Sequence, residues 1–102
     1  MQIFEVRISQ EALNDMGELR MFLNNMMSEE GAVRYANAMR AEINSLSVYA
    51  TFTARTSSKT LKKIHPDARR MVSHNRRWIY IYHIEEDVVI VDRIIPAKMN
   101  KG

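Results

Sequence analysis

The fold is decided by residues 69–95, RRMVSHNRRWIYIYHIEEDVVIVDRII. This stretch contains two runs rich in β-branched and aromatic residues, 78–84 and 88–95, with the charged segment 85–87 between them. Residues of this kind suit a pleated, packed surface, and a three-residue break between two such runs predicts an antiparallel hairpin. Residues 69–73 form a third expected strand ahead of the hairpin.

Both faces of this expected sheet are largely apolar. Because successive side chains of a strand point to opposite faces, one face is lined by Trp78, Tyr80, Tyr82 and Ile84. The same alternation assigns to the other face Ile79, Ile81, His83, Val89, Val91 and Arg93. An antiparallel sheet commonly keeps one face in water, so the chain must cover both faces or a partner must cover one. The register stays open, because a slip of one residue at 85–87 exchanges the faces.

A short strand and two amphipathic helices precede this sheet. Residues 3–8 alternate as a strand does, Ser9 occupies an N-cap position, and apolar residues then follow at helical spacing to about Met27. Ser28 can cap a second helix. The expected apolar stripes are Leu13, Met16, Leu19 or Arg20, Leu23 and Met26 or Met27 on the first helix, and Val33, Ala36, Met39, Ile43 and Leu46 on the second. Gly17 is expected to mark a close approach of the helices.

The order strand–helix–helix–strand–strand–strand predicts one α+β domain over residues 1–102, with a helical hairpin packed on one face of a small, mainly antiparallel sheet. The helices should take the bulky face that includes Trp78. The opposite face should then lie partly open, and a contiguous exposed apolar patch marks an interaction site. We therefore predict partner-binding residues Ile79, Ile81, His83, Val89, Val91 and Arg93.

Composition excludes several classes of site. Cysteine is absent, so neither disulfides nor thiolate zinc ligation contributes, and three histidines without compact spacing predict no metal site. No cofactor is expected. The sequence contains no run of about 18 apolar residues, so no membrane span is expected. The start MQIFEVRIS lacks the features of a secretory signal. A cytoplasmic location is the expectation.

Charge is distributed unevenly along the chain. Residues 1–54 carry four basic and seven acidic side chains, a net of −3, whereas residues 55–102 carry eleven basic and five acidic ones, a net of +6. A basic region attracts phosphate backbones or an acidic protein segment. The alternative is a solvated strand edge, which lysine and arginine often protect. The candidate contact residues for nucleic acid or an acidic segment are Lys62, Lys63, Arg69, Arg70, Arg76 and Arg77.

Two segments carry a family resemblance. VRISQEALNDMGELRMFL (6–23) resembles the V-R-x-S-x-x-A-x-x-D-L start of the RelE/ParE superfamily of small bacterial toxins. RRWIYIYHIEEDVVIVDRII (76–95) is similar to that superfamily's R-Y-x-I-x-Y-R-x-x-x-D-x-V-x-V-x-R-I-L ending. The resemblance implies the toxin of a type II toxin-antitoxin, or plasmid stabilisation, system, neutralised by a cognate antitoxin. Its target would be DNA gyrase for a ParE-like member, or ribosome-bound mRNA for a RelE-like endoribonuclease.

Particular positions favour the ParE-like branch. The nuclease branch places an arginine where this chain has Ile79, and a tyrosine or histidine near the C-terminus, where this chain reads AKMNKG. The ParE-like pattern retains Arg93 within DRII. If the chain is RelE-like, the resemblance and the chemistry of RNA cleavage indicate catalytic residues Arg77, His83, Arg93 and Lys98. A decayed toxin that only binds its antitoxin is the third reading.

Overall fold

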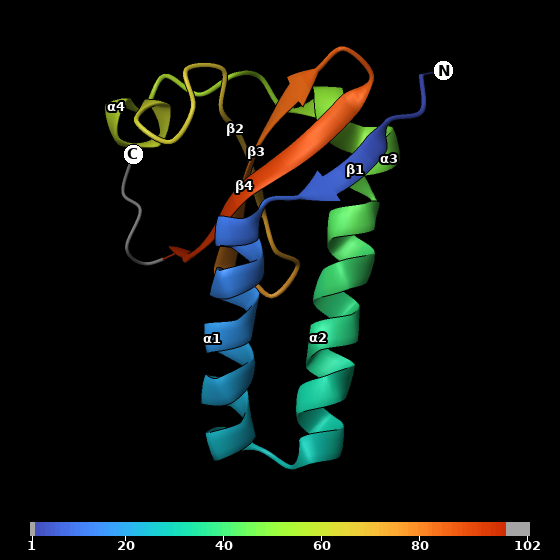
Figure 1. Cartoon of the computed structure of the whole chain (residues 1–102), viewed down its shortest axis with the longest axis vertical. Coiled ribbons are helices and arrows are strands. Elements are labelled where there is room, and N and C mark those ends of the chain that lie inside the picture. The colour runs from blue at the N-terminus through green and yellow to red at the C-terminus, as the bar shows by residue number, and fades with distance from the viewer. Residues whose placement is uncertain (1, 98–102) are drawn as a thin grey trace.

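A computed structural model describes residues 2–97. Figure 1 shows a small sheet with two long helices that lie side by side and extend well past it. The elements, in chain order, are β1 (Glu5–Ile8), α1 (Gln10–Met26), α2 (Glu29–Asn44), α3 (Leu46–Tyr49), the 3-10 helix η1 (Ala50–Phe52), α4 (Lys59–Lys62), β2 (Arg69–Val72), β3 (Trp78–Glu85) and β4 (Val88–Pro96). The sheet order is β1-β4-β3-β2, with β1 parallel to β4 and the other pairs antiparallel. The predicted α+β class and element order are confirmed, and α3, η1 and α4 are short additions.

Serine caps start both long helices, as the sequence predicts. The Ser9 hydroxyl accepts a hydrogen bond from the Ala12 amide, and the Ser28 hydroxyl accepts one from the Gly31 amide. The predicted stripes are wrong at their first positions, because Leu13 and Val33 are exposed while Ala12 and Ala32 are buried. The buried stripe of each helix thus starts at an alanine, and both alanines belong to the main apolar cluster.

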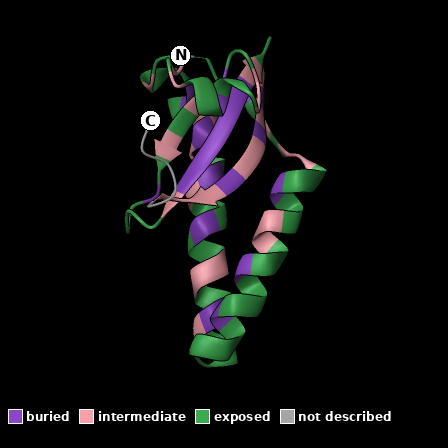
Figure 2. Cartoon of the chain, turned by 90° about the vertical axis from the view of Figure 1, so that its left-hand side faces the viewer, coloured by how far each residue is buried: buried purple, intermediate pink, exposed green. Residues whose placement is uncertain are grey.

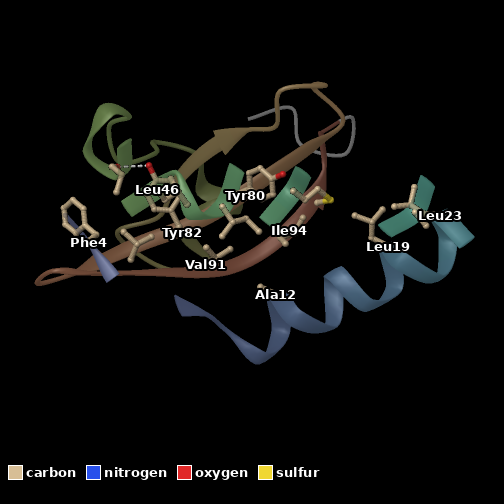
Figure 3. Close-up of a cluster of buried hydrophobic side chains, with 14 residues drawn as sticks. Phe4, Ala12, Leu19, Leu23, Leu46, Tyr80, Tyr82, Val91 and Ile94 are labelled. Carbon is tan, nitrogen blue, oxygen red and sulfur yellow. Dashed lines mark hydrogen bonds between the residues drawn. The ribbon is translucent and has the colours of Figure 1, made fainter. Parts of the chain in front are cut away.

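The main core lies between the sheet and the helices. Figure 3 shows Tyr80, Tyr82 and Val91 among the side chains of this cluster, which extends from Phe4 at one end to Leu23 at the other. Figure 2 shows buried residues concentrated in the sheet, while much of the helical surface is exposed. The expectation that the helices take the face of Tyr80 and Tyr82 is confirmed.

The face of the sheet that was predicted to be open is covered in the part of the chain that the structure describes. Ile79 and Ile81 are 3% and 0% exposed, because α4 and its flanking loops place Leu61 and Ala68 against them in a second apolar cluster. Residues 53–68, which we call the covering segment, therefore hide the face that the sequence analysis assigned to a partner. Periodicity missed this cover because the segment is irregular and has no amphipathic repeat.

A β-bulge explains why Val89 and Val91 also lie inside. The pairing of β3 with β4 changes register between Ile81, opposite Arg93, and Tyr82, opposite Val91, which leaves Asp92 as the extra residue of β4. A bulge reverses the facing of the side chains on one side of it. Val89 and Val91 consequently belong to the main core and are 0% exposed, so their predicted role on an open face is wrong.

Candidate functional site

Within residues 2–97, most of the large exposed apolar side chains lie on the helices. Met21, Phe22 and Met26 of α1 are 70%, 54% and 66% exposed. Phe22 also lines two surface cavities, of about 430 and 580 Å3. Trp78 and Pro96 line both of them as well. Because the two cavities share these lining residues, we call them together the Phe22–Trp78 groove. Its remaining lining includes Asp15, Glu18 and Arg93 at one end and Arg76 and Arg77 at the other.

Helix α2 holds the wall of this groove in place. Trp78 donates from Nε1 to the Tyr35 hydroxyl at 2.7 Å, and Asn75 donates from Nδ2 to the same oxygen at 2.8 Å. Glu42, two turns further along α2, accepts from the His74 amide at 2.6 Å and from the Tyr80 hydroxyl at 3.1 Å. The β2–β3 turn is therefore tied to α2 at several points, and the indole enters the groove from a fixed position.

Burial and the nearby Glu42 carboxylate act together on Tyr80. Desolvation of the buried ring is the larger cause and the Glu42 charge and hydrogen bond reinforce it, so the pKa of the Tyr80 phenol is raised well above its ordinary value. Burial likewise raises the pKa of Tyr82, although the hydrogen bond from Thr53 and the charge of Arg69 oppose it. Both hydroxyls act as neutral hydrogen-bond donors inside the fold.

Arg93 is held by the chain itself. Its Nε and Nη2 donate to the two carboxylate oxygens of Asp15 at 2.8 and 3.0 Å, and this pairing raises the pKa of the guanidinium. Asp15 also accepts from the Ile94 amide at 2.9 Å. Strand β1 ends at Ile8, opposite Val91, and does not pair with the later residues of β4. The Asp15 carboxylate therefore accepts a hydrogen bond from a β4 amide that β1 does not reach. Arg93 is therefore part of a structural contact at one end of the groove.

His83 is the centre of a second polar cluster, on the face covered by the covering segment. Its ring is 4% exposed, with Nδ1 2.6 Å from Asp92 Oδ2 and Nε2 3.2 Å from Glu85 Oε1. His65 stacks on it with ring centroids 3.6 Å apart and an interplanar angle of 5°. Glu85 shares a face with His83 because it is two positions further along β3, and the bulge directs Asp92 to the ring. This cluster was not predicted from the sequence, in which the i, i+2 spacing of His83 and Glu85 is its only local signal.

The six predicted basic contact residues lie in or next to α4, on the edge strand β2 and in the turn that follows it. Lys62 and Lys63 end α4, Arg69 and Arg70 lie on the edge strand β2, and Arg76 and Arg77 lie in the turn after it. All are exposed except Arg69, which is half-buried and donates to the Thr53 carbonyl. Four of the six therefore lie on or beside the β2 edge of the sheet, and their predicted contact with nucleic acid or an acidic segment stays a prediction.

The residues proposed for RNA cleavage are not brought to one point. Arg77 precedes β3 and His83 lies six residues further along it, which at 3.3 Å per residue separates them by about 20 Å. His83 is buried under the covering segment, and Arg93 is paired with Asp15. Arg77 and Arg93 do line the same groove, from opposite ends. Lys98 lies outside the described residues.

The fold defines a small α+β protein with a helical hairpin on a four-stranded mixed sheet, the architecture that the sequence resemblance implies. Neither a family model nor a curated protein matches the chain. Among solved structures, a chain described as "Chromosomal ParDE TA system from P. aeruginosa" is similar, with a TM-score of 0.77 and 13% sequence identity. The match covers 92% of this chain and 96% of that chain. The fold is thus ParE-like over 92% of the chain. In residues 2–97, no helix combines the length and the apolar character that crossing a bilayer requires.

Proposed function

We propose that this chain is the toxin component of a type II toxin-antitoxin, or plasmid stabilisation, system of the ParE-like branch. The observation that carries the proposal is the fold match to a ParDE chain, which spans nearly all of both chains. The two motif-bearing segments 6–23 and 76–95 support it independently, since they form α1 and the β3–β4 hairpin of the matched architecture.

The antitoxin, in this proposal, binds the Phe22–Trp78 groove in place of the sheet face. Exposed aromatic surface beside a hollow is the usual setting for an apolar anchor residue of a partner. Arg76 and Arg77 at one end of the groove would attract acidic side chains of the bound segment. An antitoxin segment with an apolar anchor followed by acidic residues fits this groove.

The target of the free toxin is DNA gyrase in this proposal. Support comes from the state of the residues that mRNA cleavage would need. His83 is buried and engaged by two carboxylates, and the charge of Arg93 is matched by Asp15, so within residues 2–97 these side chains are not available to a phosphate. A RelE-like endoribonuclease is the second candidate, and the exposed basic residues along β2 favour it.

Induction of the chain without its antitoxin separates the candidates. Gyrase inhibition predicts filamentous cells, an SOS response and loss of supercoiling by purified gyrase. Rapid loss of translated mRNA with normal supercoiling would instead establish the endoribonuclease and refute the gyrase proposal.

A matched pair of variants tests the groove. Phe22→Ala should weaken antitoxin binding by about tenfold or more, as removal of a central aromatic anchor does. Phe52→Ala should leave it unchanged, because Phe52 is 73% exposed but lies in η1, outside the lining of the groove. Equal effects of the two substitutions would show that the antitoxin does not use this groove.

A further inference from the structure

The cluster around His83 has the composition of a metal site. The donor atoms of His65, His83 and Glu85 all lie within 4.8 Å of one another. They come from separate parts of the chain, since His65 follows α4 whereas the other two lie on β3. Two imidazoles and one carboxylate are a ligand set that Zn2+ uses, with a water completing four-coordination.

The surroundings of His83 are those of a histidine ligand. Asp92 Oδ2 lies 2.6 Å from Nδ1 and Glu85 Oε1 lies 3.2 Å from Nε2, so Nε2 is the ring nitrogen that a metal held by Glu85 would reach. A carboxylate on the far nitrogen of the ring is the typical second partner of a metal-bound histidine, because it orients the ring and raises its basicity. The bulge that isolates Asp92 from strand pairing is what places this carboxylate there.

Charge supports the same assignment. Glu85 and Asp92 are both directed at one histidine that is 4% exposed, so two negative charges converge on a ring that carries at most one positive charge. A dication between Glu85 and the two rings would balance both carboxylates. The Glu85 side chain is 62% exposed, which leaves an entry route from solvent.

We propose that His65, His83 and Glu85 bind a divalent transition-metal ion of the Zn2+ type, with Asp92 positioning His83. In a tetrahedral site with bonds of about 2.0 Å the donors stand roughly 3.3 Å apart, so the present donors must move inward. Stacked rings do not direct their nitrogens at one point. His65 therefore turns out of the stack and exchanges its hydrogen bond from the Asp67 amide for a bond to the metal.

Metal binding would fasten the covering segment to the sheet. His65 belongs to that segment, whose Leu61 and Ala68 shield Ile79 and Ile81. A bond from His65 to the ion held by His83 and Glu85 would add a cross-link between the cover and β3. Zn2+ should therefore slow hydrogen exchange in residues 53–68 and raise the thermal midpoint, since a ligand that binds only the folded chain stabilises it.

Calorimetric titration of the metal-free full chain with Zn2+, together with the absorption spectrum of the Co2+ form, tests the proposal. One saturable site per chain is expected for Zn2+, whereas Mg2+, which prefers oxygen ligands, should not compete. His65→Ala and Glu85→Gln should each abolish saturation or weaken it more than tenfold. Asp92→Asn should weaken it by about 10- to 100-fold, the usual effect of losing such a partner.

His74→Ala is the matched control, because His74 is exposed in the β2–β3 turn. It should retain full affinity and the Co2+ spectrum of the parent chain. All variants are checked by circular dichroism, and His65, only half-buried, can be truncated without opening the core. Absence of saturable binding in the parent chain would overturn the proposal, as would equal losses in the His74→Ala and His65→Ala variants.

Discussion

The contact between Asp15 and Arg93 should be one of the strongest polar interactions of the fold. The Asp15 carboxylate accepts three hydrogen bonds, two from the guanidinium and one from the Ile94 amide, and its side chain is 13% exposed. Breaking a fully buried pair costs about 3–5 kcal/mol. Arg93 is 38% exposed, so solvent screening reduces that figure. We expect Asp15→Ala to lower the free energy of unfolding by about 2 kcal/mol, or roughly 8–16 °C in Tm.

A double-mutant cycle measures the interaction directly. Asp15→Ala, Arg93→Ala and the double variant are unfolded in urea, and the coupling free energy should be about 1–2 kcal/mol. Arg93→Ala alone should cost less than Asp15→Ala, because the Asp15 carboxylate then still accepts from the Ile94 amide.

An exposed ion pair in the same chain provides the control for this cycle. Glu30 and Arg34 form an i,i+4 pair on α2 whose side chains are 79% and 77% exposed. Their coupling should be about 0.5 kcal/mol or less. Equal coupling free energies for the two pairs would refute the argument that burial and the backbone amide strengthen the Asp15 contact.

Two further predictions concern α1 and the buried phenols. Gly17→Ala should raise the free energy of unfolding, measured in urea, by about 1 kcal/mol, because a Cβ at Gly17 meets no atom within 4 Å. Gly31→Ala should raise it less, because its Cβ comes 3.2 Å from the Ser28 hydroxyl. A lower free energy of unfolding in Gly17→Ala would contradict this reasoning. The raised pKa of Tyr80 means that the folded chain keeps a proton that the unfolded chain releases above about pH 10, so the stabilisation is complete below that pH and declines as pH rises further. Above about pH 10, the free energy of unfolding measured in urea should fall with pH less steeply in Tyr80→Phe than in the parent chain, by up to about 1.4 kcal/mol per pH unit. Equal pH dependence in the two chains would count against a proton retained at Tyr80.

Local pattern was sufficient for the two long helices, the four strands and their order, but not for α3, η1 and α4. The serine caps, the helical spacing and the two apolar runs each depend on residues within a few positions of one another, so they are readable without the fold. The main core was largely predictable for the same reason, since Tyr80 and Tyr82 follow simple alternation along β3. Gly17 was misread, because its expected close approach to another helix is not present.

The candidate sites were less predictable. The groove joins Phe22 of α1 with Trp78 and Pro96, which belong to different elements and meet only when the sheet and the helices pack. The predicted partner face failed because its residues were identified from alternation alone, which contains no information about irregular segments. Arg93 was predicted to bind a partner protein, whereas in the structure its guanidinium pairs with Asp15 of the same chain.

The sequence by itself determined the α+β class, the element order, the two capped helices and the basic character of residues 55–77. Only the tertiary structure decided which surface is exposed and which polar groups meet. One extra residue, Asp92, shifts the strand pairing and turns Val89 and Val91 inward, while the covering segment closes the remaining face and stacks His65 on His83. These outcomes depend on contacts between residues far apart in the chain, and no local periodicity encodes them.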